Sequence, residues 1–229
     1  ALNLTLQHVY LATAKMVPNQ DQPCQANWCE PVPNPYKKWS DIDSSLPDVK
    51  IEILGPPPTS GTRDAFQELA MSGGAAAYAH MNALKSSDKA LWKKLTRTVR
   101  EDGAWIDAGE NDNLMVSKLV ANPDAVGVFG FSFLDQNADK IKGSMVNNIE
   151  PTFENIAGGD YKISRSLYFY IKHAHVGTIP GIQEFVGAFT SENAFGEEGY
   201  LVDKGLIPLP EAERNKYRND GRSLNKLAM

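Results

Sequence analysis

The sequence has few cysteines, few histidines, no long apolar run and no excess of basic residues. Its 229 residues include 2 cysteines and 4 histidines, and the formal net charge is −5. General binding to nucleic acid requires a basic face that releases counterions, so that class of function is excluded. No stretch approaches the roughly 18 apolar residues of a membrane-spanning helix, so no integral membrane segment is expected. The N-terminus also lacks the pattern of a signal peptide, so a targeting segment was either removed or never present.

The two cysteines and the histidines predict no metal site and no cofactor. Cys24 and Cys29 lie five apart in the loop-like run NQDQPCQANWCEPVPNP. They form a disulfide in an oxidising compartment, or else remain as unpaired thiols. Zinc would require two more ligands near them, and no histidine is close in sequence. His173 and His175 are two apart, but no third ligand accompanies them.

The apolar residues, 42% of the chain, alternate between strand-like and helix-like patterns. This alternation predicts an α/β protein. Residues 17–47 are expected to form a long loop, and the polar residues 211–229 a helix or a frayed tail. The patterns predict strands over 49–54, 104–106, 126–134 and 167–171, and helices over 3–16, 61–70, 87–99, 112–120 and 180–189. The aromatic residues within 167–171 are expected to be strand core.

The stretch GPPPTSGTRDAF, residues 55–66, is predicted to turn from a strand into a helix. A helix N-terminus offers unpaired backbone N–H groups and a partial positive charge. Thr59, Ser60 and Thr62 add hydroxyl groups, Gly61 permits close approach, and Arg63 adds a guanidinium group that suits a tetrahedral oxyanion. The alternative is a simple helix cap beside a solvated arginine. The stretch is not a Walker A loop, because it has no Gly-Lys-Ser or Gly-Lys-Thr.

Four blocks of sequence carry a resemblance to a known family. They are TSGTRDAF, ENDNLMVSKLVANPDAVGVFGFSFL, YKISRSLYFYIKHAHVGTIPGIQEFV and GYLVDKGLIPLP. In this order and spacing, from Leu2 to Pro210, the chain resembles the phosphate-binding proteins of bacterial phosphate ABC transporters. The resemblance implies a periplasmic-binding-protein-like (type II) α/β fold whose two lobes close over inorganic phosphate. It also implies a periplasmic or secreted binding protein, not an enzyme, that delivers phosphate to the permease subunits.

By position, Ser60, Gly61 and Thr62 match the family's phosphate-holding corner, and Arg63 matches an arginine that follows it in many members. Some members instead carry an arginine before the corner, where this chain has three prolines. Family members also have a further N-terminal piece, which holds other phosphate contacts. The resemblance then implies one nearly complete lobe over residues 1–162 and the returning part of the other over 163–229. An incomplete lobe predicts exposed apolar surface, and therefore a dimer or a partner chain that completes it.

Acidic residues near the corner bear on the choice of anion. Phosphate keeps one or two protons near neutral pH and sulfate keeps none, so a carboxylate that accepts a hydrogen bond favours phosphate. Glu110 and Asp112, in GENDN, are the nearest candidates. The alternatives are a helix N-cap for Asp112 and a solvated loop position for Glu110. Asp64 is expected to complement the helix dipole or to pair with Arg63.

Two other functions are compatible with the same corner. A phosphomonoester hydrolase would use Ser60 as a nucleophile and would need a histidine within reach. The sequence has no GxSxG elbow, since GFSF at Gly130 lacks the second glycine. A phosphate-sensing or adhesion protein would use the same lobe without a transporter.

Overall fold

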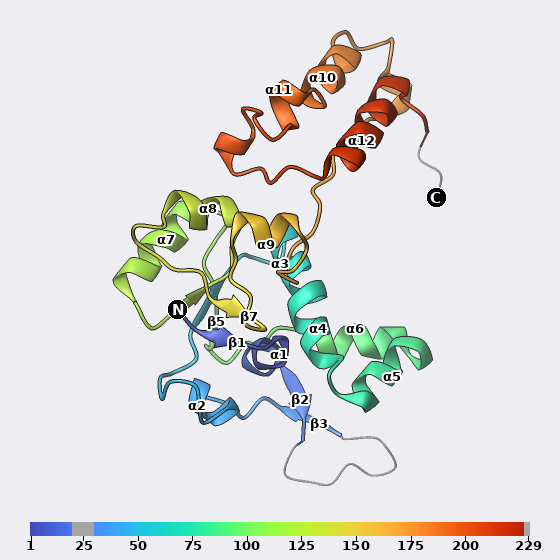
Figure 1. Cartoon of the computed structure of the whole chain (residues 1–229). Helices are drawn as coiled ribbons and strands as arrows, with labels where there is room; N and C mark the ends of the chain where they lie inside the picture. Colours follow the sequence, from blue (N-terminus) through green and yellow to red (C-terminus); the bar gives the residue numbers. More distant parts are fainter. Residues whose placement is uncertain (20–29, 227–229) are drawn as a thin grey trace. The chain divides into compact units, whose positions relative to one another are not determined.

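The computed structural model describes residues 1–19 and 30–226, and these residues divide into two compact units. The first unit comprises residues 1–151 and 161–164, and the second comprises residues 152–160 and 165–229. Figure 1 shows the chain coloured from its N-terminus to its C-terminus. Compact units are parts of this chain, whereas lobes are parts of the whole binding fold. The lobe boundary expected after residue 162 therefore stays a prediction.

The first unit holds the strands of the described chain and most of its helices. Its strands are β1 (Asn3–Leu4), β2 (Met16–Pro18), β3 (Pro31–Pro33), β4 (Ile53–Gly55), β5 (Trp105–Asp107), β6 (Val126–Gly127) and β7 (Met145–Val146). Its helices are α1 (Leu6–Thr13), α2 (Trp39–Ile42), α3 (Gly61–Phe66), α4 (Ser72–Ala75), α5 (Ala79–Ser87), α6 (Lys89–Arg97), α7 (Asp112–Ala121) and α8 (Phe131–Gln136). A π-helical turn, Gln67–Met71, joins α3 to α4.

A three-stranded parallel sheet in the order β5-β4-β6 lies at the centre of this unit. In its register Gly55 pairs with Asp107 and Leu54 pairs with Gly127. Because the strands are parallel, all three end at the same edge. Each strand leads through a short loop into a helix, α3, α7 or α8, so three helix N-termini begin beyond this edge (Figure 1). Ligands of open α/β sheets bind at such edges.

A large apolar cluster supports the sheet, and a smaller one is built on Leu54, Ala108 and Met115. Tyr10, Trp39, Ile51 and Met71 are fully buried within the large cluster. Helix α1 begins with a capping box, in which the Thr5 hydroxyl accepts the His8 N–H at 3.0 Å and His8 Nδ1 accepts the Thr5 N–H at 3.3 Å. This helix packs against α4, and the two approach closely where α4 carries glycine.

Several sequence-predicted elements are shorter than expected or begin elsewhere. The strand predicted over 126–134 ends at Gly127, and α8 starts at Phe131. A nearly continuous apolar run fits a strand or a buried helix equally well, and here tertiary packing splits it between the two. The helix expected over 87–99 begins at Lys89, because Asp88 caps it by accepting the Leu91 N–H at 2.9 Å.

The second unit contains helices and loops. They are α9 (Phe153–Ala157), α10 (Ile182–Phe189), α11 (Glu192–Phe195), α12 (Glu211–Ser223) and two 3₁₀ turns, His173–His175 and Val202–Lys204. Helix α10 packs against α12 around the buried side chain of Val186. Arg214 of α12 is also buried; it pairs with Glu197 at 3.1 Å and donates to the Leu209 carbonyl at 2.6 Å.

The strand predicted over 167–171 is absent from the second unit as described. The segment has no regular secondary structure and belongs to none of the described sheets. Its aromatic side chains were expected to be strand core, and they are exposed instead, by 62% at Tyr168 and 80% at Tyr170. A run of this composition becomes core only when neighbouring strands and a second layer cover it, and the described chain supplies neither.

Candidate functional site

The predicted turn from strand to helix is confirmed, and it lies at the carboxyl edge of the parallel sheet. Strand β4 ends at Gly55, the loop of three prolines follows, and α3 begins at Gly61. Ser60 is the N-cap, and its hydroxyl accepts the Thr62 N–H at 3.2 Å. The helix then continues through the π-helical turn into α4. Its N-terminus therefore presents donors and a partial positive charge at the sheet edge.

Arg63 is held in place by three groups from the two adjacent strands and their loops. Its side chain is only 13% exposed, and its guanidinium carbon lies 5.3 Å from the centre of the Trp105 ring. Nη1 donates to the Pro56 carbonyl at 3.1 Å and to Asp107 Oδ1 at 2.5 Å. Asp64 was expected to complement the helix dipole or to pair with this arginine; it lies in the first turn of α3, and Arg63 forms its ion pair with Asp107, at the end of β5.

Trp105 and Gly55 explain why the Arg63 side chain occupies a defined position. The Trp105 indole N–H donates to the same Asp107 oxygen at 2.9 Å, so ring, carboxylate and guanidinium group fix one another. Gly55 lies under the ring, and a Cβ atom there would overlap the indole. Phe66 packs on the ring as well, with centroids 5.6 Å apart. The positive charge is therefore pre-positioned, which lowers the entropy lost on binding an anion.

The loop between β5 and α7 brings the two predicted acids to the same edge. The Thr59 hydroxyl donates to Glu110 Oε1 at 2.6 Å, so Glu110 contacts the corner directly. The expectation that Asp112 caps the helix is wrong. Asn111 is the N-cap, and its Oδ1 accepts the Asn113 and Leu114 N–H groups at 3.0 and 3.3 Å.

Asp112 lies one residue further on, in the first turn of α7. Burial of its carboxyl group raises its pKa above the usual range; a hydrogen bond with the Gly130 backbone opposes this shift, and the charge of Glu110 adds to it. Gly130 precedes α8, so the backbone that follows β6 lies near this carboxyl group. A raised pKa is typical of a carboxyl group that can share a proton with a ligand.

The arrangement suits an oxyanion that keeps a proton. Helix donors, hydroxyl groups and Arg63 attract negative oxygens, whereas Asp107 contacts Arg63 and Glu110 contacts Thr59, so two carboxylates lie against the corner. A fully deprotonated anion would meet repulsion from these acids, while a protonated oxygen could donate to one of them.

Asp107 and Trp105 were missed by the sequence reasoning. One signal was available, because an acid directly after a predicted strand lies at the carboxyl end of a parallel sheet. Cys24 and Cys29 lie outside the described residues, and His173 and His175 belong to a 3₁₀ turn of the second unit. Among residues 1–19 and 30–226, no group of three or more His, Cys, Asp or Glu side chains is arranged to hold a metal ion.

A parallel sheet whose carboxyl edge meets the N-termini of three helices is typical of open α/β domains, in which ligands bind at that edge. The model of one family, described as a PBP superfamily domain, matches residues 3–193. The chain belongs to this family, and the predicted periplasmic-binding-protein-like fold class is confirmed. None of the helices formed by the described residues is long and apolar enough to cross a lipid bilayer.

The chain is similar in sequence to several named proteins. The chain is 29% identical over 197 residues to the phosphate-binding protein PstS of Staphylococcus haemolyticus, covering 83% of this chain and 51% of the relative. It is 26% identical over 189 residues to the protein of the same name from Staphylococcus aureus strain USA300, covering 80% and 48%. The chain thus spans about half the length of the curated relatives it matches.

Two crystal structures support the fold. A possible phosphate binding protein from Planctomyces limnophilus superimposes with a TM-score of 0.61 at 22% identity, covering 99% of this chain and 66% of the other. PstS from Borrelia burgdorferi superimposes with a TM-score of 0.51 at 18% identity, covering 92% and 65%. At these identities the likeness concerns the fold alone.

Proposed function

We propose that the chain binds inorganic phosphate as the substrate-binding component of a phosphate ABC transporter. The observation that carries the proposal is the Ser60-capped helix start at the sheet edge, with Arg63 fixed beside it. The names of the Staphylococcus relatives support the choice of ligand. Periplasmic or secreted location, and delivery to the permease subunits, follow from the same relationship.

In this proposal each corner residue has a defined task. Ser60 and Thr62 donate hydroxyl hydrogen bonds to phosphate oxygens, and Gly61 lets an oxygen approach the backbone closely. Arg63 supplies the positive charge from its fixed position over Trp105. Thr59 has one of two roles. Either its hydroxyl group turns away from Glu110 and donates to the ligand, or it keeps its bond to Glu110 and orients that carboxylate toward the ligand.

The acids would give the site its preference for phosphate over sulfate. Glu110 or Asp112 accepts the proton that phosphate retains, and repels an anion without one. Asp112 is the stronger candidate, because burial favours its protonated form and so weakens its repulsion of the incoming charge. No described contact favours the phosphomonoester hydrolase alternative, since the described hydrogen bond of the Ser60 side chain is with the Thr62 N–H and not with a histidine.

Calorimetric titration of ligand-stripped protein with phosphate, and then with sulfate, tests the proposal. We expect the double variant Thr62→Val and Arg63→Ala to weaken phosphate binding by at least about 100-fold, because two charge-assisted hydrogen bonds are lost and each contributes about 1.5–3 kcal/mol. Lys93→Ala, at an exposed position of α6, is the control and should bind as the unchanged chain does. Unaltered phosphate affinity in the double variant would show that the corner is only a helix cap.

A further inference from the structure

Helix α6 of the first unit turns a group of lysines toward solvent. Its lysine face consists of Lys89, Lys93 and Lys94, and all three side chains are exposed. The opposite side of the helix contacts α4, α5 and the π-helical turn, and there Trp92 joins the large apolar cluster. Lys85, in the last turn of α5, adds a fourth exposed lysine shortly before the helix begins.

The surrounding chain supplies almost no acid to balance these lysines. Residues 72–100 contain six basic residues and a single acid, Asp88, although the whole chain has 23 basic and 28 acidic residues. The Asp88 carboxylate caps α6 by accepting the Leu91 N–H. Among the ion pairs that the described residues form, none includes Lys85 or a member of the lysine face. The lysine face is therefore a local excess of positive charge on an acidic chain.

These charges do little to stabilise the helix that carries them. Lys89 stands in the first turn of α6, where the helix dipole favours an acid and no acid is present. Lys89 and Lys93 are four residues apart, and like charges at this spacing repel each other. A helix face that is merely solvated typically carries both signs, whose pairs add stability. The arrangement therefore indicates a negatively charged partner outside the chain.

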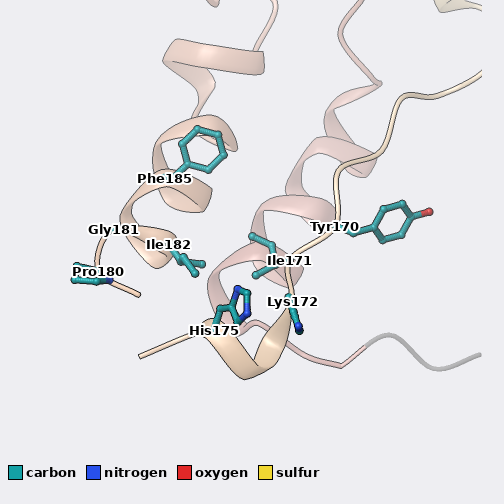
Figure 2. A pocket seen from close by; sticks show the side chains of 8 residues that line it. All are labelled: Tyr170, Ile171, Lys172, His175, Pro180, Gly181, Ile182 and Phe185. Atoms are coloured by element: carbon teal, nitrogen blue, oxygen red, sulfur yellow. The ribbon is translucent and has the colours of Figure 1, made fainter. Parts of the chain in front are cut away.

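A lysine of the second unit illustrates the contrast with the lysine face. Lys172 lines a cavity of about 350 Å³ together with apolar side chains such as Ile182 and Phe185 (Figure 2). One charge among apolar groups produces no extended positive field. On α6 the exposed side is instead charged along its length, and Ala90 is the remaining exposed residue of the helix.

The residue type favours a membrane surface over a protein partner. Lysine carries a compact, strongly hydrated charge on a flexible stem. Protein interfaces are depleted in lysine and enriched in arginine and aromatic residues, and the exposed side of α6 presents neither an aromatic ring nor an exposed arginine. Anionic lipid headgroups present a diffuse negative potential that requires no matched shape, and each lysine near them adds to the attraction.

Screening by salt lets this local charge act although the net charge of the chain is −5. At physiological ionic strength the interaction between exposed charges fades over about 8 Å. A membrane that meets the lysine face therefore interacts more strongly with these lysines than with acids elsewhere on the molecule. Figure 1 shows α5 and α6 well apart from α7 and α8, so this contact leaves their N-termini at the sheet edge uncovered.

We propose that the lysine face of α6, extended by Lys85, docks the protein on a membrane surface rich in anionic phospholipid headgroups. The contact is electrostatic and peripheral, with the lysine ammonium groups at the level of the headgroup phosphates. It does not depend on which anion binds at the Ser60 corner.

Co-sedimentation of the whole chain with sucrose-loaded vesicles tests the proposal. The probe vesicles contain equal parts of phosphatidylglycerol and phosphatidylcholine, and the control vesicles contain phosphatidylcholine alone. In about 0.1 M salt we expect a partition coefficient at least about tenfold higher for the anionic vesicles. Raising the salt to about 1 M should remove this preference, because the Debye length falls to about 3 Å.

Two double variants with the same change in net charge separate the lysine face from overall charge. Lys93→Glu with Lys94→Glu should lower the partition onto anionic vesicles at least about tenfold. Lys140→Glu with Lys142→Glu, at exposed positions that follow α8, is the matched control and should change it less than about twofold. Circular dichroism checks that the helices remain in both variants.

Three outcomes would overturn the proposal. The first is equal partition of the unchanged chain onto anionic and neutral vesicles. The second is an equal loss in both double variants, which would make the effect one of net charge and not of the lysine face. The third is binding of a labelled oligoglutamate peptide, measured by fluorescence anisotropy, without binding to anionic vesicles. That result would assign the lysine face to an acidic polypeptide.

Discussion

At the scale of single residues, Arg63 is the side chain on which the candidate site depends most. It is nearly buried, yet its charge is balanced by a carboxylate that is itself 51% exposed. Besides the ion pair, the Trp105 ring and the Pro56 carbonyl contact the guanidinium group. The arginine can therefore exchange its contact with Asp107 for one with a bound anion at little structural cost.

Asp107→Asn tests this exchange. Because the change removes a negative charge beside Arg63, we expect anion affinity to rise about three- to tenfold, with sulfate gaining more than phosphate. Calorimetric titration with both anions measures this. A fall in affinity for both would mean that Asp107 positions the arginine and does not compete with the ligand.

Arg100 and Asp102 make the stability of the first unit depend on pH. Arg100 is 2% exposed, and hydrogen bonds from its side chain hold the pKa of Asp102 well below the usual range, against the opposing effect of burial. A lowered folded-state pKa contributes stability that is fully present above the unfolded pKa of about 4 and is lost as the pH falls below it. We expect urea unfolding to show this loss between about pH 4 and pH 2.

Asp102→Asn should reduce the free energy of unfolding at pH 7 by about 1–3 kcal/mol, because it leaves a buried guanidinium group without its counter-charge. The variant should also lose less unfolding free energy than the unchanged protein as the pH falls from about 4 to about 2. Glu101→Gln is the matched control, since that carboxylate pairs with Lys15 at the surface and should matter less. Equal effects of the two variants would refute the role assigned to Arg100.

At the scale of elements, the contact of α1 with α4 shows how glycine sets a helix packing distance. A Cβ atom at Gly74 would overlap the Leu6 carbonyl and crowd Tyr10, both on α1. At Gly73 the nearest atom is the tip of the Leu6 side chain, 3.2 Å away, which can move. The two neighbouring glycines thus face different neighbours.

Gly74→Ala should destabilise the protein by about 1–3 kcal/mol, because α1 and α4 must separate to admit the methyl group. Gly73→Ala, as control, should be neutral or stabilise by up to about 1 kcal/mol, since alanine favours the helix. The midpoints of urea unfolding of the two variants measure these effects. Equal midpoints would show that the helices part freely.

The elements themselves were only partly predictable. The start of α3 followed from local residues, because a capping serine and small neighbours mark a helix N-terminus wherever they occur. The elements formed by residues 126–134 did not follow from local residues, because their apolar side chains fit either a strand or a buried helix. Phe129 packs against the cluster around Met115, and α8 then begins two residues later.

At the scale of the whole molecule, the two compact units have separate cores. The first is built around a large buried cluster that includes Trp39, Trp92 and Trp105. The second relies on a few buried residues, among them Val186 and Ala194. All four tryptophans precede residue 106, so their fluorescence reports on the first unit alone.

We expect the second unit to unfold at a lower temperature than the first, since it buries less apolar surface. Far-UV circular dichroism should then show an early transition that tryptophan fluorescence does not. Val186→Ala should lower the temperature of that early transition only. Coincident transitions by both probes would mean that the units unfold together.

The sequence by itself determined the α/β class, the helix start at Ser60 and the group of small donors with Arg63, because these depend on residues adjacent in the chain. It could not determine that Asp107 and Trp105 fix this arginine, since both follow it by about forty residues and meet it only through strand pairing. Nor could it determine that Leu167–Ile171 would lie exposed. Burial of an apolar strand depends on the neighbours that cover it, and those are a property of the tertiary structure.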